Sequence, residues 1–244
     1  MRIAIYNQMF GLNGKSFWAN LIGHWTVHYQ TNPEKIWKKV NLEKTVEIIK
    51  KSKADIAGII EVLEGQEEKL KEGLRKEGYN FFLLGKGHKT KYSGLYVQEL
   101  VASKRRGEQK NIGEWPVENK LGGGGGLVCV YYPEPQFHLI LAHFGLPSKK
   151  YYWEQIGFLQ DYLRKINGKV IVLGDFNSPY KNLKPYLSSF ELVSGEIKSC
   201  STTPIIKWFY NKDVDHILTK GFKLIKCETI EGRSDHKLIY ADLK

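Results

Sequence analysis

The sequence predicts one large domain of mixed α and β structure, because of its length and two recurring patterns. A chain of 244 residues can bury a sizeable core. Short apolar runs that end in Gly, Asp or Asn, such as Val170–Leu173, are typical of strands buried on both faces. Other segments, such as Tyr151–Ile166, carry apolar residues at helical spacing. We therefore treat residues 1–244 as a single domain.

These two patterns define the elements in chain order. Apolar residues alternate between the two faces over residues 2–7, and Pro33, preceded by Asn32, favours the start of a helix that continues to Lys53. Strands are expected at residues 2–7, 55–62, 79–84, 95–97, 100–103, 127–132, 137–144, 170–173, 214–218 and 238–243. Helices are expected over residues 33–53, 66–77 and 151–166, and near 183–187.

An aromatic-rich segment at residues 10–37 follows the first strand. Its rings are spaced too irregularly for one helix face, and the segment is too long for a plain connection. Two interpretations are open: a loop or small subdomain at the rim of a cleft that offers stacking surfaces, or an ordinary satellite core. The aromatic residues are Phe10, Phe17, Trp18, Trp25, Tyr29 and Trp37.

Five consecutive glycines, Gly122–Gly126, lead into the strand at 127–132. They follow no strand–glycine–helix pattern, so we interpret them as a mobile loop. This loop is either a linker or a flap that closes on a substrate. Strands continue on both sides at the same rhythm, which argues against a domain boundary.

The net charge of +11 favours a phosphate-rich partner, but most of it comes from lysine. Only 6 of the 37 basic residues are Arg, the residue best suited to phosphate recognition. A lysine-rich excess is equally consistent with genome composition or a hot habitat. Lys104-Arg105-Arg106 is the best local candidate for a phosphate contact, with a solvated loop as the alternative.

Neither a membrane segment nor a disulfide framework is evident in the sequence. No run approaches the roughly 18 apolar residues of a membrane helix, and Met1–Phe10 does not resemble a signal peptide. We therefore expect a cytoplasmic monomer without membrane insertion. The three cysteines, Cys129, Cys200 and Cys227, lie outside any zinc-type spacing, and we assign them no chemistry.

Polar side chains recur at the ends of the predicted core strands. The segment Gly174-Asp175-Phe176-Asn177 places a carboxylate and an amide two residues apart, with Phe176 directed into the core. Glu61 stands in an apolar run, where a carboxylate is costly unless it is paired or bound to a cation. Taken singly, the segment at Asp175 would be an ordinary polar turn and Glu61 a paired carboxylate in the core. His143 would be a core histidine whose hydrogen bonds are satisfied. The full set is Asn7, Glu61, His143, Asp175, Asn177, Asp215, Asp235 and His236.

The motifs that hold these residues are IYN, DIAGIIEV, LAHF, GDFN, VDHI and SDH. In this order and at these spacings, the sequence resembles the endonuclease/exonuclease/phosphatase superfamily between residues 7 and 236. The resemblance implies a DNase I-like α+β fold, a four-layer α/β/β/α sandwich of two packed mixed β-sheets flanked by helices. It also implies a divalent-metal-dependent phosphoric ester hydrolase.

The family's pattern implies a metal site of oxygen ligands. Glu61 would be the principal ligand of Mg²⁺ or Mn²⁺, with Asn7 and Asp235 at or next to the metal. Hard oxygen ligands and retained waters are what Mg²⁺ requires.

The same pattern implies roles for five catalytic residues. Asp175 would orient and deprotonate the attacking water, and Asn177 would hold that water and the phosphate. His236, steered by Asp215, would stabilise charge on the non-bridging oxygens. His143 would donate to the phosphate or assist the leaving group.

Two positions depart from the family's pattern, and the branch stays unresolved. Ile60 stands where the family usually has Gln, and Asp213 where it usually has a basic residue. His143 favours the DNase I, tyrosyl-DNA phosphodiesterase, deadenylase and sphingomyelinase-like branches over the abasic-endonuclease branch. The leading interpretation is a phosphodiesterase acting on nucleic acid. The alternatives are an enzyme for a small or lipid phosphate, such as an inositol phosphate, and an inactive nucleic-acid-binding scaffold.

Overall fold

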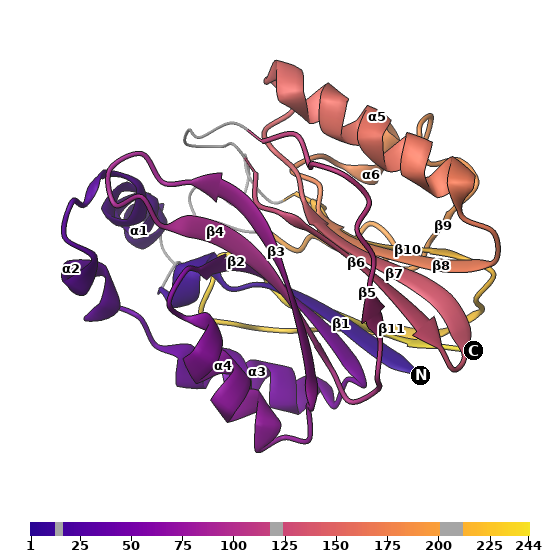
Figure 1. Cartoon of the computed structure of the whole chain (residues 1–244), viewed down its shortest axis with the longest axis horizontal. Coiled ribbons are helices and arrows are strands. Elements are labelled where there is room, and N and C mark those ends of the chain that lie inside the picture. Colours follow the sequence, from indigo (N-terminus) through magenta and orange to yellow (C-terminus); the bar gives the residue numbers. More distant parts are fainter. Residues whose placement is uncertain (13–16, 118–123, 201–211) are drawn as a thin grey trace.

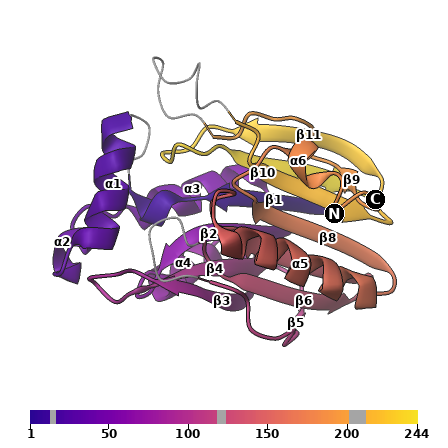
Figure 2. The ribbon, with the colours of Figure 1, turned by 90° about the horizontal axis from the view of Figure 1, so that it is seen from above.

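The computed structural model describes residues 1–12, 17–117, 124–200 and 212–244. In this part of the chain, two six-stranded sheets pack face to face, and helices cover the outer face of each (Figures 1 and 2). The four-layer α/β/β/α sandwich of two mixed sheets, expected from the resemblance, is confirmed.

The first sheet is built from both ends of the sequence. Strand β1 (Arg2–Asn7) runs parallel to β2 (Ile56–Leu63), and the other strand pairs of this sheet are antiparallel. Helices α3 (Leu42–Ser52) and α4 (Glu67–Arg75) pack their buried residues against its outer face. The strand order is β11 (Leu224–Ile230), β12 (Leu238–Leu243), β1, β2, β4 (Tyr96–Ser103) and β3 (Phe81–Lys89).

The second sheet comes from the later part of the chain. Strands β7 (Gln136–His143) and β8 (Lys169–Asp175) are parallel and are joined by α5 (Lys150–Lys165), which lies on the outer face near the short α6 (Tyr180–Leu183). A helical crossover is the usual way to join parallel strands. The strand order is β5 (Glu108–Gln109), β6 (Leu127–Pro133), β7, β8, β10 (Asp215–Lys220) and β9 (Glu191–Leu192).

Alternation along the strands separates the central core from the outer layers. Ile3 and Ile5 join the cluster between the two sheets, whereas Ala4 and Tyr6 join the cluster under α3 and α4. Gly58 in β2 lets the sheets approach closely, because a Cβ there would lie 2.7 Å from Cδ1 of Leu141. Phe176 is fully buried in the outer core under α5, as predicted.

The described part of the aromatic-rich segment, residues 9–12 and 17–37, is largely helical, and its aromatic residues belong to three helices and not to one helix face. It contains the 3-10 helix η1 (Met9–Gly11), α1 (Phe17–Tyr29) and α2 (Pro33–Trp37). Its residues divide between a small core and the surface. Phe10 and Val27 lie in a satellite core, whereas Trp25 and Tyr29 are exposed on α1.

Other boundaries differ for identifiable reasons. The helix expected at 33–53 is two helices, because Asn41 accepts a hydrogen bond from the Lys44 amide and so begins α3 anew. The short strands expected at 95–97 and 100–103 are the single strand β4, and the helix expected near 183–187 is α6. Edge strand β11 was not predicted, and it has no buried residue.

Two remaining expectations concern segments that are only partly described. Gly124–Gly126 are buried against the core, while residues 122–123 and the aromatic loop expected at 202–210 lie outside the described residues. None of the described helices has the length and apolar composition needed to span a bilayer.

Candidate active site

Polar residues of the second sheet meet at one end of three neighbouring strands. His143 is in register with Asp175 across the parallel pair β7–β8, and Asp215 is opposite Asp175 across the antiparallel pair β8–β10. Equivalent positions of paired strands lie side by side, so the three side chains belong to one edge of the sheet. The sequence predicted each of these residues separately, and the register brings them together.

Asn7 and Glu61, in the first sheet, lie beside Asp175 and His143 of the second sheet. Nδ2 of Asn7, at the end of β1, donates to Oδ2 of Asp175 at 3.1 Å. Glu61, in the neighbouring strand β2, hydrogen-bonds to Asn7 and lies with its Oε1 3.9 Å from Nε2 of His143. The candidate site therefore includes residues of both sheets.

A β-bulge directs the Glu61 side chain into the site. The pairing of β2 with β4 shifts register between Ile59 and Val62, and Glu61 has φ of 59°. That left-handed conformation costs on the order of 1–2 kcal/mol for a residue with a Cβ, and bulges commonly re-aim a side chain beside a functional site. Two buried amides hold it in place. Nε2 of Gln8 donates to the Glu61 carbonyl at 3.3 Å and to Oε1 of Gln66 at 3.0 Å.

Sequence reasoning did not identify Gln8 or Gln66. At the position before Glu61, where the family usually has a glutamine, this chain has Ile60. Gln8 and Gln66 supply buried amides at this bulge from other elements, so hydrogen-bonding support for Glu61 is present at a different place in the chain.

Burial makes the two central carboxyls reluctant to ionise without a cation. Burial, reinforced by the charges of Asp235 and Asp175, raises the pKa of Glu61 to about 8. Burial and the charge of Asp215 raise the pKa of Asp175 to about 7. Carboxyls that gain stability from nearby positive charge are what a divalent-cation site requires.

The donor set fits such an ion. Oε2 of Glu61 is buried, and among the described residues it has no hydrogen-bond partner. A buried carboxylate oxygen without a donor is costly unless a cation satisfies it. Asn7 and Asp235 add further oxygen atoms near Glu61, consistent with the preference of Mg²⁺ for hard ligands.

His236 is held by Asp215. Its Nδ1 donates to Oδ2 of Asp215 at 2.6 Å, and its Nε2 lies 3.8 Å from Oδ2 of Asp175. Burial alone would lower the pKa of His236, but the combined charges of Asp215, Cys200 and Asp235, with the hydrogen bond to Asp215, outweigh burial and hold that pKa well above its usual range. The imidazole is therefore a cation directed at the carboxylate of Asp175. His216, the next residue after Asp215, faces the other way, because alternate residues of a strand point to opposite faces, and its Nε2 bonds to the Ser178 carbonyl at 2.8 Å.

His143 lies between two buried carboxyls, one of which sequence reasoning missed. Nδ1 of His143 is 3.6 Å from Oε1 of Glu99, on the side of the ring opposite Glu61. Glu99 is fully buried, and burial raises its pKa well above the ordinary value. The signal was available, because a carboxylate within the apolar run Tyr96–Ser103 presents the same problem as Glu61.

The glycines before β6 enclose this pair. The amide of Gly126 donates to Oε2 of Glu99, and a Cβ at Gly125 would collide with Oε1 of Glu99 and lie 2.8 Å from Nδ1 of His143. The described part of the glycine run is therefore a wall of the site made of backbone, not a linker between strands.

The remaining predicted residues complete the cluster. Asn177 has φ of 50°, and its Nδ2 donates to the Phe144 carbonyl at 2.8 Å, while its amide donates to Oδ1 of Asp175 at 2.8 Å. Oδ2 of Asp235 is 3.9 Å from Nε2 of His236. All eight predicted residues thus lie in one site. Lys104–Arg106 do not, because they follow the end of β4 that pairs with the beginning of β2, away from Glu61.

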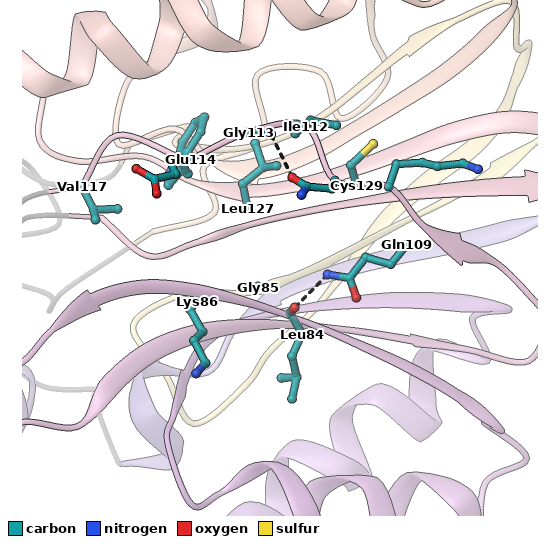
Figure 3. A pocket seen from close by; sticks show the side chains of 13 residues that line it. Leu84, Gly85, Lys86, Gln109, Ile112, Gly113, Glu114, Val117, Leu127 and Cys129 are labelled. Atoms are coloured by element: carbon teal, nitrogen blue, oxygen red, sulfur yellow. Dashed lines mark hydrogen bonds between the residues drawn. The ribbon is translucent and has the colours of Figure 1, made fainter.

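A groove on the described surface is a different feature. It has a volume of about 640 Å³ and runs between the edges of the two sheets, where Nε2 of Gln109 donates to the Leu84 carbonyl at 3.1 Å (Figure 3). None of the eight predicted residues lines it. Its lining combines charged, polar and apolar side chains. The candidate active site is the cluster of strand-end residues.

Comparisons with known proteins identify the family. The family model described as "Endonuclease/Exonuclease/phosphatase family" matches residues 37–236. The chain belongs to this family. Its members are phosphoester hydrolases, generally with divalent metals, and the motifs from DIAGIIEV to SDH fall within the match. No curated protein matches the chain.

Solved structures of the family share the fold at low identity. One from Beutenbergia cavernae DSM 12333 has a TM-score of 0.73 and 15% identity, covering 100% of this chain and 71% of that one. The mannosyl-6-phosphatase of Bacteroides thetaiotaomicron VPI-5482 has a TM-score of 0.63 and 17% identity, covering 100% and 99%. The human Nocturnin catalytic domain with bound sulfate has a TM-score of 0.60 and 15% identity, covering 100% and 93%. At such identities the likeness shows the fold alone.

Proposed function

We propose that the chain is a Mg²⁺- or Mn²⁺-dependent phosphodiesterase that hydrolyses phosphate esters in nucleic acid. The observation that carries the proposal is the convergence of Glu61 and Asp175 from different sheets on Asn7. Oε2 of Glu61 is buried and has no hydrogen-bond donor among the described residues.

The metal would be held by Glu61, with Asn7 and Asp235 at or beside it. When bound, the ion neutralises charge on a phosphoryl oxygen and lowers the barrier to attack at phosphorus. Glu61 gives up its proton to bind the ion, and the bulge that Gln8 and Gln66 support keeps its carboxylate in place.

Asp175 is the proposed general base. Its pKa, raised to about 7, lets it accept a proton from water near neutral pH. The bonds from Asn7 Nδ2 and the Asn177 amide hold its two oxygens in fixed directions. Asn177 would hold the attacking water and the phosphate.

The two histidines are the proposed donors to the phosphate. His236, kept cationic by Asp215, would stabilise negative charge on the non-bridging oxygens as the transition state forms. His143, which lies between Glu61 and Glu99, would donate to the phosphate or protonate the leaving group.

An exposed aromatic cluster supports a polynucleotide substrate. Trp25 and Tyr29 stack with ring centroids 5.9 Å apart, and Tyr92 lies 5.6 Å from Tyr29. All three are more than two-fifths exposed, and their elements follow the ends of β1 and β3, beyond the strand ends that carry Asn7 and Glu61. Exposed rings of this kind stack nucleobases at about 1–3 kcal/mol per base, and the net charge of +11 favours a polyanion.

A second candidate is a phosphatase or phosphodiesterase for a small phosphate ester. It is favoured by the catalytic carboxylates and imidazoles, each at most 9% exposed, which suit a small phosphate group. The likeness to the mannosyl-6-phosphatase, 99% of which the chain covers, points in the same direction.

A substrate panel separates the two candidates. The protein is incubated with Mg²⁺ and single- and double-stranded DNA, RNA, 5′-tyrosyl DNA, inositol phosphates and sugar phosphates. We expect cleavage of a polynucleotide. We further expect Trp25→Ala and Tyr92→Ala to weaken that cleavage about 5- to 100-fold, while Trp25→Phe, which keeps a ring, loses less. Cleavage of small esters only would favour the second candidate, and no cleavage of any ester would refute both.

A further inference from the structure

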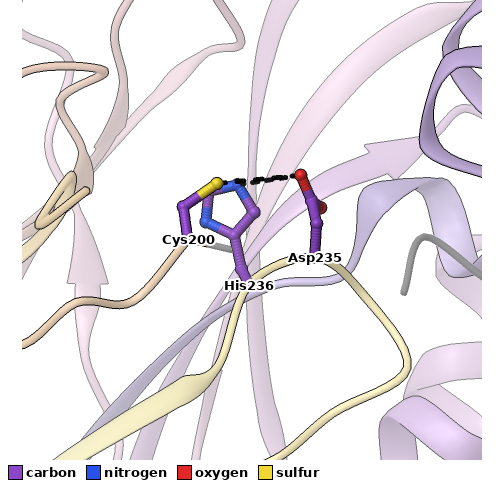
Figure 4. Close-up of side chains that lie close together, drawn as sticks. All are labelled: Cys200, Asp235 and His236. Atoms are coloured by element: carbon purple, nitrogen blue, oxygen red, sulfur yellow. Dashed lines mark hydrogen bonds and ion pairs between the residues drawn. The ribbon is translucent and has the colours of Figure 1, made fainter. Parts of the chain in front are cut away.

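Cys200 is the one cysteine of the described chain that touches the candidate active site. Its Sγ donates to Oδ2 of Asp235 at 3.7 Å, and the His236 ring lies beside both (Figure 4). Sequence spacing gave this residue no role, because its neighbours Asp235 and His236 come from a segment 35 residues later. The three side chains point toward one another from two adjacent stretches of backbone (Figure 4).

We propose that Cys200, Asp235 and His236 form a second metal site that takes a soft divalent ion such as Zn²⁺ and thereby inhibits the enzyme. Sulfur, nitrogen and carboxylate oxygen are the zinc donors of proteins, and three protein ligands leave a fourth position open. Mg²⁺ prefers oxygen ligands, so the thiolate distinguishes this site chemically from the one at Glu61, although both use Asp235.

The spacing of the donors suits such an ion. The three ligand atoms lie within 4.8 Å of one another, with Nε2 of His236 3.9 Å and Sγ of Cys200 3.7 Å from Oδ2 of Asp235. Zinc bonds of about 2.0–2.3 Å in tetrahedral geometry place ligand atoms roughly 3.4–3.7 Å apart. A bound ion would therefore draw the three together by about 1 Å or less.

The site is also held in position before any ion binds. The backbone of Cys200 is bridged to both Lys212 and His236, with the amide of Cys200 donating to the Lys212 carbonyl at 3.1 Å. Nδ1 of His236 is occupied by Asp215 at 2.6 Å, which leaves Nε2 as the ligating nitrogen. A carboxylate behind a metal-binding histidine fixes the ring and raises its basicity.

Inhibition follows from which atoms the ion would take, and this consequence rests on the proposed function. Coordination uses the Nε2 lone pair of His236, so that His236 can no longer act as a cation toward the phosphate. The Cys200 thiol and the His236 imidazolium each release one proton to solvent, and no electron is transferred.

Co²⁺ serves as the spectroscopic probe, because a thiolate bound to Co²⁺ gives a near-ultraviolet charge-transfer band. The full-length protein in Mg²⁺ buffer is titrated with Co²⁺, and Zn²⁺ is then added to displace it. We expect the band in the wild type and in Cys227→Ser, whose thiol is a matched control on β11, and its loss in both Cys200→Ser and Cys200→Ala. A band that persists in folded Cys200 variants, or that never appears in the wild type, overturns the proposal.

Zn²⁺ inhibition provides the second readout. For each variant, activity with Zn²⁺ is divided by its own activity without Zn²⁺. Loss of the Cys200 thiolate should weaken Zn²⁺ inhibition by roughly 10- to 100-fold or more. Removing a residue that only supports a metal ligand already lowers metal affinity by about that factor. Equal Zn²⁺ sensitivity of wild type and Cys200→Ser would contradict inhibition through this site. A Cys200-dependent band without phosphoester activity would instead refute the proposed function and leave the metal site standing.

Discussion

Asn7 donates from Nδ2 to Oδ2 of Asp175 at 3.1 Å, and this bond joins the end of β1 in one sheet to the end of β8 in the other. The proposed metal ligand, Glu61, and the proposed base, Asp175, therefore share one positioning amide. Any change in how the sheets pack would move these two carboxylates relative to each other. The sandwich is thus part of the active-site geometry.

Asp175→Asn should remove the proposed general base with little effect on the fold. The substitution keeps the size of the side chain, and we expect kcat to fall about 10²- to 10⁴-fold. Steady-state kinetics on the best ester of the panel measure the loss. Asp161→Asn, on the exposed face of α5, is the control, and a variant at 175 as active as that control would exclude Asp175 as the base.

Asp215→Asn should change the pH dependence as well as the rate. The charge of Asp215 keeps the pKa of His236 high, so removing that charge lowers the pKa and the imidazolium loses its proton at lower pH. The alkaline limb of the pH–rate profile should therefore shift to lower pH, with a loss of about 10²- to 10³-fold at the optimum. An unchanged alkaline limb would mean that the charge of His236 is not used.

Glu61 should make the metal-free protein less stable as pH rises. Its folded-state pKa is about 8 and its ordinary value 4.5, so between these values the unfolded state loses a proton that the folded state keeps. The free energy of unfolding should fall with pH across this window, by up to about 1.4 kcal/mol per unit from this group. Thermal unfolding in EDTA from pH 5 to 8 tests this, and Glu61→Gln should have the shallower slope.

Mg²⁺ should reverse that loss in the wild type. At about 100 times Kd, a ligand specific for the folded state adds about 2.7 kcal/mol. We expect a clear rise in Tm for the wild type and a much smaller one for Glu61→Gln. An equal rise in both proteins would place the ion elsewhere.

Gly125→Ala should disturb the Glu99–His143 pair. A Cβ there collides with Glu99, so we expect a loss of stability of about 1–3 kcal/mol, as for other overpacked sites, and reduced activity. Gly157→Ala in α5 is the matched control. A Cβ at Gly157 meets no atom within 4 Å, and the change should stabilise the helix by about 0.5–1 kcal/mol. Normal stability and turnover of Gly125→Ala would show that the glycine wall is not required.

The sequence predicted the parts of this molecule that have regular local patterns. Val170–Leu173 and Ile56–Ile60 identify buried strands, and the ordered motifs lead to the family and the sandwich. Polar residues that close such strands, including Asp175, could be found for the same reason.

The remaining features depend on contacts between distant segments. The sequence shows that Glu99 needs a partner, but only the fold identifies that partner as His143, and Gln8 becomes notable only when it reaches the Glu61 bulge. The edge strand β11 has no buried residue. Cys200 gains its neighbours through a backbone bridge that no spacing rule contains.

Hydrolysis in ¹⁸O-labelled water tests the central claim most directly. The best substrate of the panel is cleaved with Mg²⁺, and both products are analysed by mass spectrometry for wild type and Glu61→Gln. We predict that wild type incorporates the label into the phosphate and not into the alcohol, and that Glu61→Gln shows little turnover. Label in the alcohol, or full turnover by Glu61→Gln, would contradict attack of water on phosphorus at this site.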